Sequence, residues 1–314
     1  MRWGAKKPKG FTLVELIVVI VITGILSTFI AQFIIQPINA YSEVARRTRL
    51  VDVAGRVMHK IRMDVREALP NSLRTGCNRT VDGESFDTCM EFLRAPFGGR
   101  YRIDGTGSAN ELKISNSTGL PLPDNGFEML VPFSADDRDA IVRNTNLAAV
   151  CADDDFYVHV VINNQGTPGA DAWEMDNMAR LGSLGVGLVA PALSTYPLVS
   201  YMDNDGSGNF TFPSVSVYQR FFLVDTPVKY VWDNAANKIN RYSCYDIEGA
   251  NVDDDDPDGE KNLLSAFVSR VKFDYQPGTS ALPIGLLNIS VTVSEDGSAE
   301  SITLLQQIQI INMS

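Results

Sequence analysis

Histidine is almost absent from this chain: only His59 and His159 occur among its 314 residues. Neither belongs to an HExxH pair or to a recognisable arrangement of nucleophile and base. The glycine-rich stretch 182–187 also lacks the lysine of a phosphate-binding loop. His59 lies in a helical pattern and His159 in an alternating, strand-like pattern, so both are expected to be structural. The sequence therefore predicts that the protein is not an enzyme.

Positive charge is scarce outside the first ten residues. The chain has 27 Lys and Arg against 38 Asp and Glu, a formal net charge of −11. Residues 1–10 contain four of the bases and no acid. Because an acidic surface repels nucleic acid and attracts cations, no nucleic-acid partner is expected. The basic segment ahead of an apolar run predicts a cytoplasmic N-terminus and an exported remainder.

Charge is also missing from residues 11–37, where Glu15 is the only charged side chain. As a helix this segment would be roughly 40 Å long, enough to cross an apolar bilayer core of about 30 Å. A secretory signal peptide has a shorter apolar core that is followed by a small-residue cleavage site. Here the small residue, Gly10, precedes the run. The segment therefore predicts a membrane-spanning helix.

Cysteine pairs with the spacing of zinc ligands are missing as well. The chain has four cysteines, namely Cys77, Cys89, Cys151 and Cys244. An even number in an exported chain is typical of disulfides, and four cysteines allow three pairings. Because Cys77 and Cys89 enclose a short loop rich in Gly, Asp and Thr, the sequence favours 77–89, which leaves 151–244. Buried free thiols are the alternative.

Residues 38–70 continue the helix with a different surface. Apolar residues at spacings of three and four, with charged residues opposite, are typical of an amphipathic helix that packs on a globular body. Pro37 is expected to kink or loosen the helix between its two halves. The turn Pro70-Asn71-Ser72 is expected to end the helix. The apolar stripe consists of Leu50, Ala54, Val57, Ile61, Val65 and Leu69.

From residue 71 onward, short β-branched or aromatic segments alternate with turns, which predicts mostly antiparallel β-structure. The predicted strands are 111–115, 156–162, 215–224, 228–232, 239–245, 268–275, 287–294 and 301–312. Two pairs are expected to form hairpins, 228–232 with 238–242 and 287–294 with 301–312. The stretch 163–187 has no clear period and is expected to be a long excursion. The predicted fold class is α+β: a long N-terminal helix packed on an antiparallel β-rich head, residues 71–314.

The residues Lys9-Gly10-Phe11-Thr12-Leu13-Val14-Glu15 resemble the cleavage signature of type IV pilins and of type II secretion pseudopilins. The resemblance implies the type IV pilin fold, a leader over residues 1–10 and a transmembrane, filament-core helix over 11–37. It implies a prepilin peptidase as one partner, which cuts after Gly10 and methylates the new amine of Phe11. The other implied partners are pilins or pseudopilins, which the chain meets in the bacterial inner membrane before it joins a filament.

Three further stretches resemble the MshO family of minor pilins, from the mannose-sensitive haemagglutinin pilus, which is itself similar to the J minor pseudopilin of type II secretion. They are 68–74, 227–233 with the following 241–242, and 306–312, and the chain departs from the pattern at Gln309 and at its last two residues. The resemblance implies a non-enzymatic minor subunit at the filament tip, with a periplasmic head. The alternatives are a pseudopilin of a secretion system and a tip adhesin that binds a surface or a glycan.

Glu15 needs a physical explanation, because a charged carboxylate within hydrocarbon costs about 2.5–3.5 kcal/mol. The next base along the helix is Arg46, roughly 46 Å away. The amine that cleavage creates at Phe11 is therefore the nearest cation. The resemblance favours the amine of a neighbouring subunit, whose pairing with Glu15 would draw subunits together and fix their axial stagger. The alternative is simple stabilisation of the first helical turn by an acid.

Two acidic stretches have the spacing of a calcium-binding loop. Residues 203–211 follow an EF-hand loop through its first nine positions, although position twelve is Ser214 and not Glu. A solvated acidic turn is the alternative for this stretch, and a disordered surface run is the alternative for 253–260. Calcium is the only cofactor that the sequence suggests, and the predicted function requires none. The candidate ligands are Asp203, Asp205, Ser207, Asn209 and Thr211 in the first stretch, and Asp254, Asp256 and Asp258 in the second.

Overall fold

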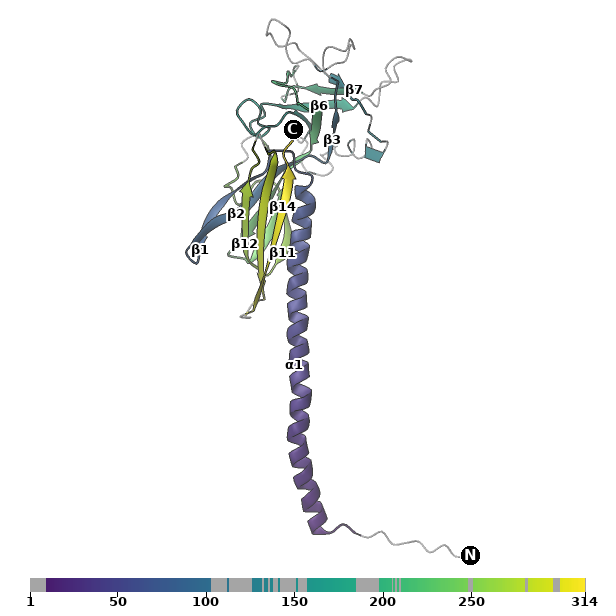
Figure 1. The fold of residues 1–314 in the computed structure, drawn as a ribbon, viewed down its shortest axis with the longest axis vertical. Helices are drawn as coiled ribbons and strands as arrows, with labels where there is room; N and C mark the ends of the chain where they lie inside the picture. Colours follow the sequence, from purple (N-terminus) through teal and green to yellow (C-terminus); the bar gives the residue numbers. More distant parts are fainter. Residues whose placement is uncertain are drawn as a thin grey trace, which may run out of the picture. The chain divides into compact units, whose positions relative to one another are not determined.

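The computed structural model describes residues 10–102, 112, 126–131, 133–134, 136–137, 141, 151, 157–184, 198–204, 206, 208, 210–247, 251–279, 282–295 and 300–313. These residues form the helix α1 and the strands β1 to β14, which Figure 1 colours in chain order. The chain separates into two compact units, Met1–Asp52 and Val53–Ser314.

The helix α1 (Leu13–Val65) begins in the first unit and is continuous through Pro37. Proline removes one backbone N–H donor, and the hydrogen bonds on both sides of it maintain the helix. The large apolar side chains that the structure describes between positions 11 and 44 are exposed. Between these positions the described apolar side chains of the helix therefore have no apolar partner among the described residues of the chain.

The end of α1 lies in the second unit, at Val65, five residues before the predicted end. The Leu69 N–H donates to the Leu93 carbonyl at 2.8 Å, and Ala68 forms a β-bridge with Arg94. Pairing with the sheet therefore replaces the last helical hydrogen bonds. The residues of the predicted apolar stripe are all buried, namely Leu50, Ala54, Val57, Ile61, Val65 and Leu69.

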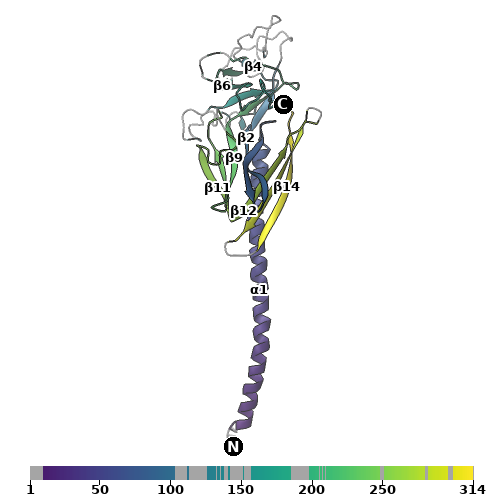
Figure 2. The same cartoon turned by 90° about the vertical axis from the view of Figure 1, so that its left-hand side faces the viewer.

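The larger sheet has eight antiparallel strands in the order β11-β10-β9-β2-β12-β13-β14, with β1 paired to β2. Its strands are β1 (Arg74–Val81), β2 (Glu84–Arg94), β9 (Thr226–Asp233), β10 (Lys238–Ser243), β11 (Glu260–Ala266), β12 (Val268–Gln276), β13 (Ile284–Ser294) and β14 (Ser301–Ile311). The two predicted hairpins, β9–β10 and β13–β14, are confirmed. Burial alternates along β13, so one face of the sheet lies in the core and the other faces solvent. Figure 2 shows this sheet alongside the last turns of α1.

The strands β1 and β2 form a hairpin that the patterns above do not predict. Its two loop residues, Asp82 and Gly83, have φ angles of 54° and 82°. Positive φ at both loop residues is the geometry of a type I′ turn, for which Asp-Gly is a preferred pair. The Asp-Gly dipeptide is therefore the signal in the sequence from which this hairpin could be predicted.

The smaller sheet closes on itself and is called the barrel here. Its six antiparallel strands follow the order β3-β8-β5-β6-β7-β4. They are β3 (Phe97–Arg100), β4 (Gly126–Glu128), β5 (His159–Ile162), β6 (Met178–Leu184), β7 (Leu198–Met202) and β8 (Arg220–Val224). A β-bridge between Tyr101 and Met129, and a 2.8 Å hydrogen bond from Leu130 N–H to the Arg100 carbonyl, join the two outer strands. The buried rings of the barrel core include Tyr101, Phe127, Phe212 and Phe221.

The barrel is an insertion between two neighbouring strands of the larger sheet. Arg94 at the end of β2 pairs with Thr226 at the start of β9. The Arg94 side chain also forms an ion pair with Asp225, with 2.9 Å between Nε and Oδ1. The two ends of the insertion therefore lie side by side, as they do where one domain is inserted into another. A disulfide between Cys151 and Cys244 connects the barrel core to the residue that follows β10.

Two strand predictions in the barrel are wrong. The stretch 163–187, predicted to be an excursion, contains β6. The predicted strand 215–224 begins only at Arg220, because the Ser216 hydroxyl accepts the backbone N–H groups of Tyr218 and Arg220 and so forms a turn. The predicted strand 111–115 lies outside the described residues except for residue 112.

A buried acid joins the last turns of α1 to the larger sheet. Asp64 is only 5% exposed, and its carboxylate accepts hydrogen bonds from Tyr230 Oη at 2.6 Å, Lys60 Nζ at 2.7 Å and Arg241 Nε at 2.8 Å. Burial by itself would raise the pKa of Asp64, but these hydrogen bonds lower it below its ordinary value. The charged carboxylate therefore fastens α1 to β9 and β10.

Candidate processing and assembly site

The predicted cleavage position, between Gly10 and Phe11, lies in irregular chain before the first turn of α1. Both residues are exposed, Phe11 by 79%. A Cβ atom added at Gly10 would meet no atom within 4 Å, so the described chain leaves room for a larger residue there. A requirement for glycine would therefore come from the enzyme that binds this segment. The rest of the predicted leader, residues 1–9, lies outside the described residues.

Glu15 and Thr12 form a capping box at the start of α1. The Thr12 N–H donates to Glu15 Oε2 at 3.4 Å, and the Glu15 N–H donates to Thr12 Oγ1 at 3.3 Å. Thr12 precedes the first helical residue and Glu15 is the third residue of the helix, which are the positions of this motif. Both hydrogen bonds are longer than usual, so the chain holds its own carboxylate only weakly.

The structure thus shows the local role that the sequence leaves open for Glu15, namely stabilisation of the first helical turn. Among the residues that the structure describes, no cation forms an ion pair with Glu15. Pairing with the amine of a neighbouring subunit involves a second chain and stays a prediction. Thr12 is the residue of this site that the patterns above miss, although the T-x-x-E spacing signals a capping box.

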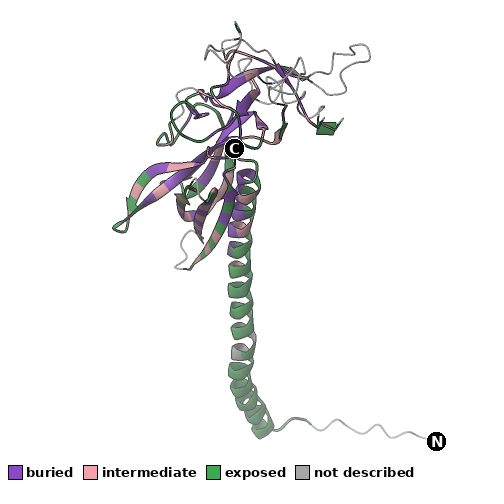
Figure 3. Ribbon diagram, turned by 45° about the horizontal axis from the view of Figure 1, so that its top comes forward, coloured by how far each residue is buried: buried purple, intermediate pink, exposed green. Residues whose placement is uncertain are grey.

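The apolar surface of α1 follows directly on this capping box. The segment Leu13–Ile30 is long and apolar enough to cross a membrane, and none of it is buried. Every residue of α1 before position 46 whose burial is described is exposed, and Figure 3 shows the N-terminal part of the helix in the colour of exposed residues. Apolar surface on this scale is stable when lipid or other protein chains cover it. The first unit of the chain is therefore suited to membrane anchoring and to packing between subunits.

Three hydroxyl side chains within the apolar half of α1 donate hydrogen bonds to carbonyls of the same helix. Thr23 Oγ1 donates to the Val19 carbonyl and Ser27 Oγ to the Thr23 carbonyl, each at 2.6 Å. Thr28 Oγ1 donates to the Ile25 carbonyl at 2.7 Å. Because each hydroxyl proton is already engaged by a backbone carbonyl, these residues can enter hydrocarbon at low cost.

The four cysteines form two disulfides, Cys77–Cys89 and Cys151–Cys244, each with 5.4 Å between the Cα atoms. This is the pairing that the sequence favours. The first bond crosslinks the β1–β2 hairpin, and the second closes a much longer loop, with 93 residues of sequence separation. No cysteine is left as a free thiol.

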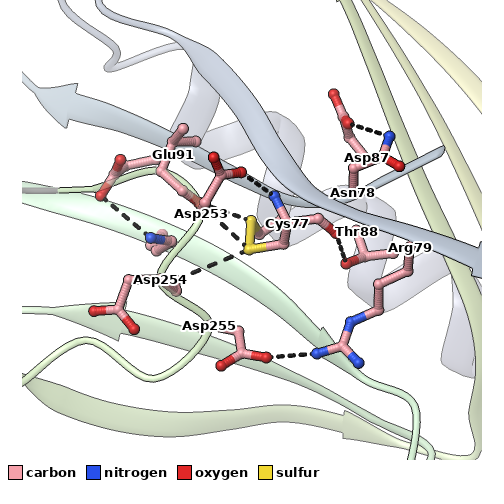
Figure 4. Close-up of a disulfide and its surroundings, with 12 residues drawn as sticks. Cys77, Asn78, Arg79, Asp87, Thr88, Glu91, Asp253, Asp254 and Asp255 are labelled. Carbon is pink, nitrogen blue, oxygen red and sulfur yellow. Dashed lines mark hydrogen bonds and ion pairs between the residues drawn. A yellow bond between two sulfur atoms is a disulfide. The ribbon is translucent and has the colours of Figure 1, made fainter.

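The acidic run 253–260 is ordered against the first disulfide. The Cys77 N–H donates to Asp253 Oδ1 at 2.8 Å, and Arg79 forms an ion pair with Asp255. Figure 4 shows these two carboxylates pointing toward Cys77 and Arg79. The alternative of a disordered surface run is therefore excluded, because donors on β1 fix the segment.

The carboxylates of Asp254, Asp256 and Asp258 do not converge. Asp256 accepts hydrogen bonds from Tyr242 Oη and Lys261 Nζ, both at 2.8 Å. In the part of the chain that the structure describes, no group of three or more His, Cys, Asp or Glu side chains could hold a metal ion. These three acids therefore form no cluster within the described residues, and calcium binding by this run stays a prediction.

The other predicted calcium loop is only partly described. Asp203 and Thr211 are described, and the ligand positions outside the described residues are Asp205, Ser207 and Asn209. The Asp203 carbonyl accepts the Gly206 N–H at 2.8 Å, and the Asp203 N–H donates to the Gly208 carbonyl at 3.1 Å. A Cβ atom at Gly206 would lie 3.1 Å from the Arg180 guanidinium. A cationic side chain therefore lies beside this turn, and calcium binding here stays a prediction.

The two histidines lie in structural surroundings. His59 Nδ1 contacts the Arg62 side chain at 3.3 Å on α1. His159 belongs to β5, where desolvation and, to a smaller extent, the nearby Arg180 guanidinium lower its pKa to about 4. The ring is therefore neutral at neutral pH, as expected of a histidine in the wall of the barrel.

The comparisons with known proteins bear on the N-terminal segment alone. Residues 5–31 match the family described as the prokaryotic N-terminal methylation motif. The match includes the Gly10–Phe11 bond, Glu15 and the first turns of α1, and the head lies beyond it. Neither a curated protein nor a solved structure matches the chain. The chain thus carries the N-terminal methylation motif on an apolar helix that leads into a large antiparallel β-sheet, as type IV pilins and pseudopilins do.

Proposed function

We propose that the protein is a minor pilin of a type IV pilus, a non-enzymatic subunit that primes or caps the filament tip. The observation that carries the proposal is the methylation motif at an accessible Gly10–Phe11 bond, followed by the apolar helical segment Leu13–Ile30, none of which is buried. The resemblance of three stretches of the head to the MshO minor pilins supports a subunit of the mannose-sensitive haemagglutinin type.

Processing by a prepilin peptidase is the first step of the proposal. Hydrolysis of the Gly10–Phe11 bond leaves a carboxylate on Gly10 and an amine on Phe11. The amine then takes a methyl group from a sulfonium methyl donor on the peptidase, which releases the neutral thioether and a proton. The exposure of Phe11 supports access of the enzyme to this bond. Thr12 and Glu15 both lie on the mature side of the cut, so the capping box survives cleavage.

The proposed location is the inner membrane, with the N-terminus in the cytoplasm and the head in the periplasm, followed by entry into the pilus. The basic leader supports this orientation. The two disulfides support an oxidising compartment for the head, because disulfides persist in the periplasm and are rare in the cytosol.

Glu15 is the proposed assembly residue. Its hydrogen bonds to Thr12 are long, so the carboxylate can exchange them for an ion pair with the Phe11 amine of a neighbouring subunit. Opposite charges attract far more strongly in an apolar environment than in water. The pair would therefore favour entry of the subunit into the filament and set its axial position.

The substitution Glu15→Val tests this role. We expect the variant to be cleaved and to accumulate in the membrane, and to be missing from sheared filaments on immunoblots. Glu43→Val is the matched control, because Glu43 is another exposed acid of α1, in an ion pair with Arg47. Normal incorporation of Glu15→Val would contradict the proposal, whereas the control should enter filaments as the unmodified chain does.

Two alternatives start from specific observations. Pseudopilins of type II secretion share the methylation motif. If the protein is such a pseudopilin, deletion of its gene would abolish protein secretion and leave piliation intact. The barrel inserted into the larger sheet supports a tip adhesin, in which the head itself binds a surface or a glycan. Binding of the purified full chain to a glycan array or to an abiotic surface would favour that role.

A further inference from the structure

The two edges of the larger sheet are protected to different degrees. At one edge, β11 begins with Glu260 and Lys261, and its pairing with β10 shifts register between Ile239 and Asn240. Charged residues and irregular pairing both hinder the addition of a further strand. At the other edge, β14 pairs with β13 along eleven residues without a shift. Neither β13 nor β14 contains a charged residue.

The outer face of β13 and β14 is also free of charge. Leu305 is 80% exposed and Ile311 is 60% exposed. The polar residues between them are uncharged and bond to one another, as when Gln307 Nε2 donates to Asn288 Oδ1 at 2.9 Å. The chain as a whole is 21% charged with a net charge of −11. Local depletion of charge together with exposed apolar residues is characteristic of the core of a protein interface.

We propose that β14 pairs at its open edge with a strand of another subunit of the same filament, so that one sheet continues across two chains. This inference rests on the proposed function. The occupant is an uncharged, β-branched edge strand of a subunit that also carries the N-terminal methylation motif. A basic partner would be drawn to the acidic surface elsewhere, whereas a chain without positive charge meets the least repulsion from this acidic head at such a neutral strip.

The geometry of β14 suits a continuous intermolecular ladder. In a strand that is paired on one side, alternate residues direct their N–H and C=O groups to the free side. Within the described residues β14 ends the strand order of its sheet, so this side has no strand partner there. Eleven residues correspond to a ladder of about 36 Å. Anchoring of both chains in one membrane would raise their effective concentration and so favour a pairing that is weak in solution.

Photo-crosslinking in cells that assemble the filament tests the proposal on the full chain. A photoreactive amino acid replaces Leu305 on β14 or, as the matched control, Leu263 on β11, which is 57% exposed. We expect position 305 to crosslink to a β-strand of another motif-bearing subunit and position 263 to give no such product. Three results would overturn the proposal. Position 305 could give no crosslinked product, or it could crosslink to a second copy of this chain or to a protein without the motif. Positions 305 and 263 could also give equal amounts of product.

Charge substitutions provide the second test. Leu305→Lys should reduce the amount of the chain in filaments roughly tenfold or more, whereas Leu263→Lys should leave it unchanged. Both residues are exposed, so neither variant should change the thermal unfolding of the head. If the unmodified chain is itself absent from filaments, the proposed function fails. If the unmodified chain and Leu305→Lys enter equally, only the proposal for β14 fails.

Discussion

The two halves of α1 share one backbone conformation and have opposite surfaces. Between positions 11 and 44 the large apolar side chains that the structure describes are exposed, whereas between positions 50 and 69 one apolar stripe is buried. Apolar character alone therefore does not determine what a helix packs against. A stripe with a spacing of three and four finds its partner in the same chain, and a surface that is apolar all round needs lipid or other chains.

Two acids, one in each half of α1, show the same difference between an outward and an inward role. Glu15 is exposed and is held by long hydrogen bonds within its own turn. Asp64 is buried and receives hydrogen bonds from α1, β9 and β10. The first carboxylate is therefore available to a partner outside the chain, and the second is committed to the fold.

Replacement of the buried acid should have the largest effect on stability. Asp64→Ala leaves the Arg241 guanidinium and the Tyr230 hydroxyl without their partner, which should lower the free energy of unfolding by about 3–5 kcal/mol. Glu15→Ala should change it by less than about 0.5 kcal/mol. Denaturant unfolding of the full chain in detergent, followed by fluorescence of the buried Trp232, measures both. Equal losses in the two variants would contradict the contrast between the halves.

Truncation of matched isoleucines should have the next largest effect. Ile61 is fully buried, and Ile61→Ala should cost about 2–5 kcal/mol through lost burial and a cavity. Ile20 is 62% exposed, and Ile20→Ala should leave unfolding of the head unchanged. Calorimetry of both variants in detergent gives the comparison. A similar fall in melting temperature for Ile20→Ala would show that the first half also packs on the head.

Acid titration should give the smallest effect. In the unfolded chain Asp64 takes up its proton near the ordinary pKa of 3.8, and in the folded chain only at lower pH. The unfolded state thus binds more protons in this window, and stability falls as pH falls through it. The contribution is complete above about pH 5. Below this pH, a plot of the unfolding free energy against pH should have a shallower slope for Asp64→Asn than for the unmodified chain. An unchanged slope would show that groups other than Asp64 cause the loss of stability in acid.

The helix could be predicted from the sequence because its signals are local. The apolar run, the stripe and the methylation motif each depend on residues within a few turns of one another. The error at the end of α1 has a tertiary cause, since the Leu69 N–H finds the Leu93 carbonyl instead of a helical acceptor. The position of the candidate site could be predicted from the methylation motif, and its capping box could be predicted from the spacing of Thr12 and Glu15.

The barrel could not be predicted in the same way. Its closure depends on the pairing of Tyr101 with Met129, and its attachment depends on the pairing of Arg94 with Thr226, which are separated by long stretches of sequence. Strand β6 is interrupted by Gly182, so its alternation is too weak to distinguish it from a loop. The β1–β2 hairpin, by contrast, could be predicted from the Asp-Gly dipeptide at its turn.

Intact-mass and peptide mass spectrometry of the chain purified from filaments tests the central claim most directly. The account predicts a mature chain that has lost residues 1–10 and begins with N-methylated Phe11. A chain in filaments that still begins at Met1, that begins at another residue, or that carries an unmodified amine at Phe11 would contradict it.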